Sequence, residues 1–196
     1  NMNKTRTNLV RLVQLMLLVA IEVIFAFTPL GFIPTPAASI TTMHLPVIIG
    51  AVLLGPLYGG ILGAVFGALS LIKASLTPNT ALSFILSPLT SGAPLASIFT
   101  CIVPRILLGV IAAYGYRLFT KLFRKESISI GVSAGVATAC HTIMVMGSLW
   151  ILFGAVKLKD IFLAIVGING VLEILAAVLI VSAVCIPLKK YLKVKG

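Results

Sequence analysis

Long apolar runs separated by short polar links make up most of this chain. The runs that predict helices cover residues 9–27, 45–55, 57–72, 98–119, 128–154 and 161–187. A helix needs about 20 apolar residues to cross the hydrocarbon core of a bilayer. The stretch 44–72 is too long for one crossing, and Gly55-Pro56 divides it because proline cannot continue the hydrogen-bond ladder of a helix interior. The pattern predicts an all-α membrane protein, a single transmembrane domain over 1–196 with a bundle of six helices.

Two of the links are long and rich in proline. They cover residues 29–43 and 73–97, and the second also contains apolar residues such as Phe84. Loops of this length inside compact proteins are commonly lids or binding segments. We therefore expect these two links to border a binding site.

Composition and charge agree with the membrane class. The chain is 60% hydrophobic and only 10% charged, whereas soluble domains carry about 25% charged residues. The net charge of +11 gathers in three clusters that flank the apolar runs. These clusters are Lys4, Arg6 and Arg11; Arg117, Lys121, Arg124 and Lys125; and Lys189, Lys190, Lys193 and Lys195. With both termini in the cytoplasm all three clusters lie inside, as the positive-inside rule requires, and both long links lie outside. The basic charge thus indicates topology and not nucleic-acid binding.

Small residues in the apolar runs indicate helix packing. Gly55, Gly59, Gly63 and Gly67 recur every four residues and predict a smooth ridge that lets another backbone approach closely. The three cysteines lie in apolar stretches and are most simply packing residues. We expect the first apolar run to be retained, because it lacks a small-residue cleavage site, and Met2 to be the natural first residue.

Arg105 is the leading candidate for contact with a ligand. It lies about six residues into the run 98–119, roughly 9 Å below the outer end of that helix. Its guanidinium fork would suit a carboxylate or phosphate on a solute. The alternative is an arginine that extends to the membrane interface. Pro104, immediately before it, would leave a backbone carbonyl free.

Further candidates share one face of the run 128–154. Thr138, His141 and Thr142 lie three and four residues apart, so they face the same side of a helix. A lone histidine is more often a packing residue, but the polar neighbours favour a site contact here. Trp150 lies nearer the outer end, where it would either anchor the helix at the interface or stack on a solute.

The remaining polar residues lie in three other runs. Asn169 and Glu173 are four residues apart and share a face of the last run, where each would contact a solute or serve as a structural hydrogen-bond partner. Glu22, near the middle of the first run, would pair with Arg105, with His141 or with a partner protein. His44 begins the second run and would be a polar residue at a helix end.

Sequence signals for enzymes are absent. The chain has no G-x-x-x-x-G-K-[ST], H-E-x-x-H or G-x-S-x-G motif, so we expect no catalytic residue, no metal site and no cofactor bound by this chain. The pattern favours a protein that binds a small organic solute within the membrane. Two alternatives remain: a stand-alone facilitator, which needs a continuous polar path, and a membrane enzyme with His141 and Glu173 as acid and base.

Three segments carry a resemblance to a known family. HLPVIIGAVLLGPLYGGILGAVFGALS, from His44 to Ser70, joins a short helix through a G-P-x-x-G turn to a glycine-rich helix, and GFIPTPAASITTM precedes it. With VPRILLGVIAAYGYRLF, these segments resemble the substrate-binding S components of energy-coupling factor (ECF) vitamin transporters, most closely the pantothenate type. The resemblance covers nearly the whole chain.

The resemblance implies where a vitamin and the partner subunits would bind. S components bind the vitamin in the outer half of the bundle, through helices four to six and the two outer loops, which adds Thr35 and Asn79 to the candidates. They associate with a transmembrane coupling subunit and two ATPase subunits, which use the ATP, and toppling on the coupling subunit releases the solute inside. An Ala-x-x-x-Ala pair often serves docking in the family; here the matching pair reads Met16 and Ala20, so half of it is present.

The chemistry of pantothenate fits the available side chains. It has one carboxylate, an amide and two hydroxyls around a branched apolar centre. Arg105 would hold the carboxylate, and amide, hydroxyl and imidazole groups would hold the rest. Biotin is also a monocarboxylate and stays open, as do riboflavin and a thiamine precursor, although a flavin would favour more aromatic stacking and a thiamine cation more carboxylates.

Overall fold

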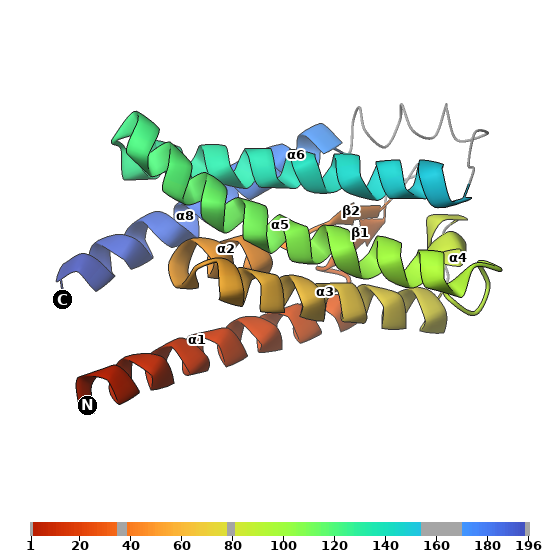
Figure 1. Ribbon diagram of the computed structural model, residues 1–196, viewed down its shortest axis with the longest axis horizontal. Coiled ribbons are helices and arrows are strands. Elements are labelled where there is room, and N and C mark those ends of the chain that lie inside the picture. The colour runs from red at the N-terminus through yellow and green to blue at the C-terminus, as the bar shows by residue number, and fades with distance from the viewer. Residues whose placement is uncertain (1, 35–38, 78–80, 154–169, 195–196) are drawn as a thin grey trace.

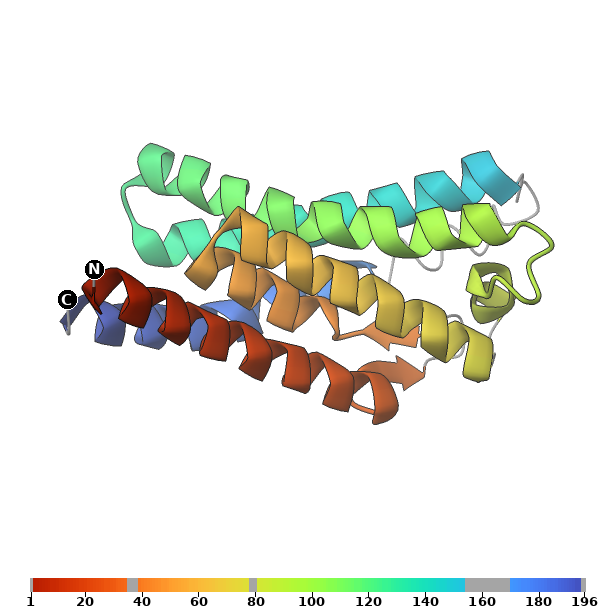
Figure 2. The same ribbon diagram turned by 60° about the horizontal axis from the view of Figure 1, so that its bottom comes forward.

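The computed structural model describes residues 2–34, 39–77, 81–153 and 170–194. Five helices in it are long and apolar enough to cross a membrane. They are α1 (Met2–Phe27), α3 (Pro56–Leu76), α5 (Pro94–Phe123), α6 (Glu126–Phe153) and α8 (Gly170–Val194). Two shorter helices are α2 (His44–Leu54) and α4 (Ala81–Leu86). The long helices lie side by side in one bundle (Figure 1; Figure 2).

Several helices extend beyond the ranges expected from hydropathy. α3 continues through Lys73 to Leu76, and Lys73 Nζ donates to the carbonyl of Ala26 at 2.7 Å, near the end of α1. α5 begins at Pro94, where proline suits the first turn of a helix. The expected long outer loop 73–97 therefore contains the end of α3, α4 and the start of α5. Residues 161–169 of the last expected run lie outside the described residues.

A short β-hairpin departs from the all-α expectation. β1 (Phe32–Pro34) pairs antiparallel with β2 (Ser39–Thr41), in the link that was expected to be an irregular loop. The hairpin leads directly into α2. Both strands lie among the helices in the two ribbon views (Figure 1; Figure 2).

The predicted glycine ridge joins α3 to α5. A Cβ added at Gly59 would lie 2.7 Å from the carbonyl oxygen of Gly109, and one at Gly67 would lie 2.8 Å from that of Cys101. A Cβ at Gly63 would collide with the backbone carbonyl of Arg105. Gly55 is not part of this ridge: it has φ +103° in the turn between α2 and α3, a conformation that suits glycine.

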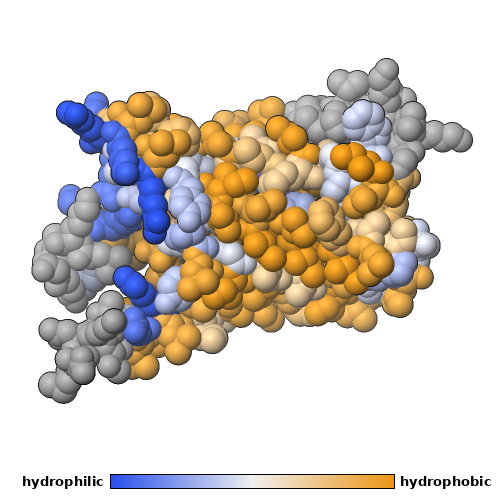
Figure 3. Space-filling view, in the orientation of Figure 1, coloured by the Kyte–Doolittle hydropathy of each residue, from blue (hydrophilic) through white to orange (hydrophobic). Residues whose placement is uncertain are grey.

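Polar and apolar residues separate along the long axis. The first turns of α1, the α5–α6 link and the last turns of α8 lie at the same end, where hydrophilic residues gather; an apolar belt covers the middle (Figure 1; Figure 3). Large apolar side chains on this belt are exposed, including Leu17, Ile143 and Leu179. Exposed apolar side chains of this kind are expected where lipid is the solvent.

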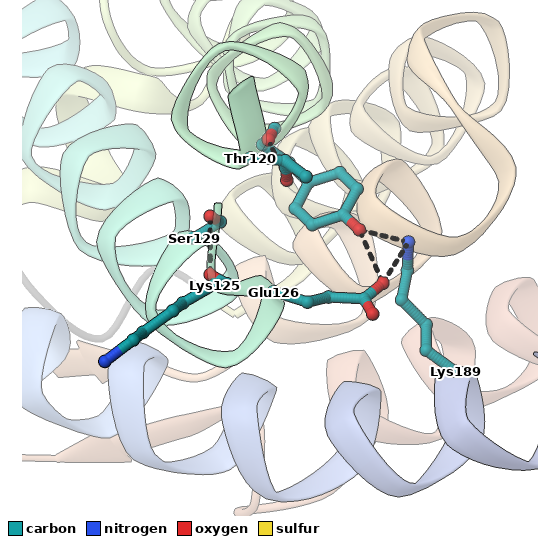
Figure 4. A network of polar contacts seen from close by, with 6 residues as sticks. Thr120, Lys125, Glu126, Ser129 and Lys189 are labelled. Carbon is teal, nitrogen blue, oxygen red and sulfur yellow. Dashed lines mark hydrogen bonds and ion pairs between the residues drawn. The ribbon is translucent and has the colours of Figure 1, made fainter. Parts of the chain in front are cut away.

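A polar network joins α5, α6 and α8 at this hydrophilic end. The Tyr116 hydroxyl donates to Glu126 Oε1 at 2.8 Å, and Lys189 Nζ donates to the Tyr116 hydroxyl at 2.6 Å. Lys189 Nζ also lies 3.5 Å from Glu126 Oε1. Figure 4 shows Glu126 and Lys189 pointing toward each other. The network ties the last helix to the rest of the bundle.

The ridge generates a prediction about stability. Gly63→Ala should lower the melting temperature of the purified protein, because the added methyl forces α3 away from α5; overpacking of this kind costs about 1–3 kcal/mol. Gly60→Ala is the matched control, since its Cβ would meet Val110 Cγ2 at 3.6 Å, an ordinary contact. Equal melting temperatures for the two variants in detergent would contradict the close α3–α5 contact.

Candidate functional site

Polar side chains from four helices and an aromatic ring from a fifth meet in the interior of the bundle. Arg105 of α5 is 7% exposed, His141 of α6 is 8% exposed, and His44 at the start of α2 is 1% exposed. Glu173 of α8 is partly buried. Phe66 of α3 is fully buried and contacts two of them. We call these five residues the central cluster.

A proline positions Arg105. Pro104 has no N–H, so the carbonyl of Thr100, four residues earlier, lacks its usual helical donor. Arg105 Nη1 donates to this carbonyl at 2.5 Å. The guanidinium carbon also lies 5.4 Å from the centre of the Phe66 ring, a cation–π distance. The sequence predicted that Pro104 would leave a backbone carbonyl without its helical donor. The Arg105 side chain donates to that carbonyl, and this hydrogen bond orients the guanidinium.

His141 lies on the other side of Phe66. The two ring centres are 6.1 Å apart, with the planes tilted by 41°. His141 interacts electrostatically with both Arg105 and His44. Arg105 and His141 therefore lie on either side of the Phe66 ring, where the guanidinium can bind an anionic group.

Glu173 connects the cluster to the β-hairpin. Its Oε1 accepts a hydrogen bond from the backbone N–H of Thr41 in β2, at 2.8 Å. Glu173 also interacts electrostatically with Arg105. Glu173 thus serves as a structural hydrogen-bond partner, one of the two roles expected for it, and its donor is a backbone N–H.

Several polar atoms of this region have no hydrogen-bond partner among the described residues. They are Nε of Arg105, Nε2 of His44, Nε2 of His141, Oγ of Ser70 and Oγ1 of Thr100. A buried polar atom left without a partner costs about 1–3 kcal/mol. These atoms remain able to form hydrogen bonds with polar groups that the described residues do not supply.

The other residues predicted on α6 differ in their placement. Thr138 is buried and Thr142 is half-buried; their hydroxyls donate to the carbonyls of Ala134 at 2.9 Å and Thr138 at 3.1 Å. Trp150 is 64% exposed, and the helical repeat of ~100° per residue places it on the side of α6 opposite His141. The structure therefore does not bring Trp150 to the central cluster.

The remaining predicted residues lie elsewhere or outside the description. Thr35, Asn79 and Asn169 fall outside the described residues. Glu22 is fully buried in α1, and among the described residues neither carboxylate oxygen has a hydrogen-bond partner. The suggested pairing of Glu22 with Arg105 or His141 is not seen there.

An apolar layer closes the end of the bundle opposite the termini. It comprises Ala74, Leu86, Cys101, Val145 and Leu149, which α3, α4, α5 and α6 contribute. The α4 segment is fastened there, because Ser97 Oγ donates to the carbonyl of Ile85 at 2.9 Å. Cys101 precedes Arg105 by one helical turn, so this layer lies next to the cluster along α5.

Two grooves on the surface of the bundle are lined by residues outside the central cluster. One is lined by Leu18, Ile21, Phe25, Leu45, Pro46, Ile49, Ile180 and Val184, and the other by residues of α6 and α8 that include Gly131 and Gly135. Neither lining contains Arg105, His141 or Glu173. The low exposure of Arg105, His141 and His44 places the cluster in the interior of the described part of the bundle.

Sequence reasoning missed four residues of this region: His44, Phe66, Ser70 and Thr100. His44 was expected at the outer face, but α2 has only 11 residues, so it starts within the bundle and not at its end. The shortness of the run 45–55 was the signal. Phe66 and Ser70 are four residues apart on α3, so they share one face of that helix. Knowing that the glycine ridge of α3 packs against α5 would have indicated that this face lies near Arg105.

The side chains present determine the chemistry. Among the described residues, no three His, Cys, Asp or Glu side chains gather as a metal ion would require. An arginine, two histidines, hydroxyls and one aromatic ring can bind a small anion with polar and apolar parts.

Two known proteins are similar to this chain over most of its length. The pantothenic acid transporter PanT of Lactococcus lactis is 32% identical over 159 residues, which is 76% of this chain and 78% of the relative. The pantothenate transporter PanT of Leuconostoc mesenteroides is 27% identical over 188 residues, which is 85% of this chain and 87% of the relative.

A family profile identifies the protein class. Residues 10–186 match the family described as "ECF transporter, substrate-specific component". With the five long apolar helices, this match indicates a multi-pass protein of the bacterial cell membrane, with a role in transport and not in catalysis. The chain belongs to the family of substrate-specific components, or S components, of ECF transporters.

Proposed function

We propose that this chain is the pantothenate-binding S component of an ECF importer, and that the vitamin binds with high affinity at the central cluster. The observation that carries the proposal is the set of unpartnered polar atoms around Arg105. The two relatives named as transporters of this vitamin support the choice of solute.

The solute would supply what the cluster lacks. Its carboxylate would bind the Arg105 guanidinium, a charge-assisted contact in a water-poor interior. Its hydroxyls and amide would bind Nε2 of His44 and His141, with Asn169, Thr138 and Thr142 as further candidates. Its branched apolar centre would pack on Phe66. Asn79 and Thr35 would contribute from the two outer loops.

The competing solutes and classes are less well supported. Biotin could use Arg105 in the same way, and the names of the two relatives are what favour pantothenate over it. A stand-alone facilitator needs a continuous polar path, whereas the apolar layer around Leu86 lies next to the cluster along α5. An enzyme would need Glu173 as a free acid or base, and its carboxylate is engaged by Thr41.

The topology follows from the charge distribution. We propose one transmembrane domain with both termini in the cytoplasm, because the basic residues gather at the end where α1 begins and α8 ends. α2 spans ~16 Å at 1.5 Å per residue, about half of the hydrocarbon core, so α2 would be a short sixth crossing and the β-hairpin before it would lie on its outer side. The hairpin and the α4 segment would then be the outer lids.

Coupling to energy would occur through separate proteins. α1 exposes Met16, which is 57% exposed, and Ala20 on its outer face. We propose that this face docks on a transmembrane coupling subunit. Two ATPase subunits would use the ATP, and toppling on the coupling subunit would release the vitamin inside. This chain itself would bind no cofactor.

The choice of vitamin is tested by ligand-induced stabilisation. Pantothenate should raise the melting temperature of the purified protein at micromolar concentration, because a ligand that binds only the folded state stabilises it. Biotin, riboflavin and thiamine should do so only at much higher concentration, and pantothenate should be recovered unchanged. A larger shift with biotin, or chemical conversion of pantothenate, would refute the proposal.

Arg105 is tested by calorimetric titration. Arg105→Ala should weaken pantothenate binding at least tenfold, about 1.4 kcal/mol, because the carboxylate loses its cationic partner. Arg117→Ala is the matched control, since Arg117 is on the same helix but lies over the Tyr114 ring, 5.7 Å from its centre, near the hydrophilic end. Unchanged affinity for Arg105→Ala would remove Arg105 from the site.

Docking is tested by co-purification. Ala20→Trp should reduce recovery of the coupling subunit several-fold while pantothenate affinity is retained, because a large side chain would separate the two surfaces. Ile143→Trp on α6 is the control, because Ile143 is also an exposed apolar residue. Equal recovery for both variants would exclude this face of α1 from the interface.

A further inference from the structure

The backbone of β2 presents a polar group to the interior of the bundle. Consecutive N–H groups of a strand point to opposite sides, and Thr42 N–H already donates to the Gly31 carbonyl at 3.1 Å. Thr41 N–H therefore points away from β1. A backbone N–H that is turned toward the interior needs an acceptor from the protein wherever water is excluded.

Glu173 is that partner. The acceptor is a carboxylate, 132 residues away in sequence, at 2.8 Å from the Thr41 nitrogen. Glu173 comes from the first turn of the described part of α8. A hydrogen bond from a backbone N–H to a carboxylate is about twice as strong as one between neutral groups. This bond joins the hairpin to α8 without involving the Thr41 side chain.

The same carboxylate belongs to the central cluster. Glu173 interacts electrostatically with Arg105 across the cluster, and His44 follows Thr41 by three residues, at the start of α2. A shift of β2 away from α8 would therefore move the start of α2 and expose the region around Arg105. The Glu173 carboxylate fastens β2 to α8, and the His44 side chain interacts with the backbone of both Thr41 and Glu173 at the same place.

We infer that Glu173 is a positioning residue whose carboxylate holds the β1–β2 hairpin closed against α8, and so limits the rate at which the solute leaves the cluster. The part of this inference that concerns solute release rests on the proposed function. The part that concerns the hairpin does not, because it is a property of the protein without solute.

Hydrogen exchange in solute-free protein tests the hairpin directly. Glu173→Met keeps the length of the side chain but has no acceptor, so exchange of the Thr41 amide should become at least tenfold faster. Glu173→Gln keeps an oxygen that accepts the same bond, so most of the protection should remain. Glu126→Met is the matched control at the hydrophilic end and should leave the hairpin amides as in the parent protein.

Two results would overturn the hairpin part. One is a Thr41 amide that exchanges equally fast in Glu173→Met and the parent protein. The other is equal acceleration in Glu173→Gln and Glu173→Met, which would mean that charge and not the hydrogen bond matters. Melting temperatures of all variants, measured in the same detergent, separate local opening of the hairpin from general unfolding.

Release of radiolabelled pantothenate tests the second part. Thr41→Pro removes the donor while Glu173 keeps its charge, and it should accelerate dissociation at least tenfold, as Glu173→Met should. If Thr41→Pro dissociates like the parent while Glu173→Met is fast, the carboxylate acts on the solute directly and the inference fails. If the parent protein does not bind pantothenate, the proposed function fails, and the exchange experiment still decides the role of Glu173.

Discussion

Backbone polar groups inside a membrane protein must find partners within the protein, because lipid offers none, and the central cluster is organised by this requirement. Two irregularities create unpaired groups: Pro104 frees the carbonyl of Thr100, and β2 turns the N–H of Thr41 away from its strand partner. Arg105 satisfies the first group and Glu173 the second. Arg105 and Glu173 therefore each bond to a different backbone group and form no direct ion pair with each other. Nε of the Arg105 guanidinium has no partner among the described residues and can bind a solute.

The glycine ridge determines where these charges lie. Because Gly59, Gly63 and Gly67 carry no side chain, α3 approaches the carbonyls of α5 closely enough to place Phe66 over the Arg105 guanidinium. The ring also contacts His141 of α6, so the Phe66 side chain lies between the side chains of Arg105 and His141. Packing and recognition therefore depend on the same helix. A methyl group on the ridge would disturb both, whereas the exposed apolar surface of the bundle tolerates changes that remain apolar.

Much of the candidate site was accessible from the sequence, because a charge inside an apolar run is costly and therefore conspicuous. This reasoning found Arg105, His141 and Glu173, which the structure brings together. It placed His44 at the outer face, because hydropathy does not reveal that a short helix starts deep in the bundle. It also could not decide between stacking and anchoring for Trp150, which the structure leaves exposed on the side of α6 opposite His141.

By itself the sequence determined the membrane class, the approximate helix positions, the close packing of the glycine-rich helix and the resemblance to S components, because each of these depends on composition or on local spacing. The tertiary structure decided which polar groups meet, that Gly55 belongs to a turn and not to the ridge, and that a β-hairpin is bound to the last helix. These depend on contacts between residues far apart in the chain, such as Thr41 with Glu173, and no local pattern records such a pairing.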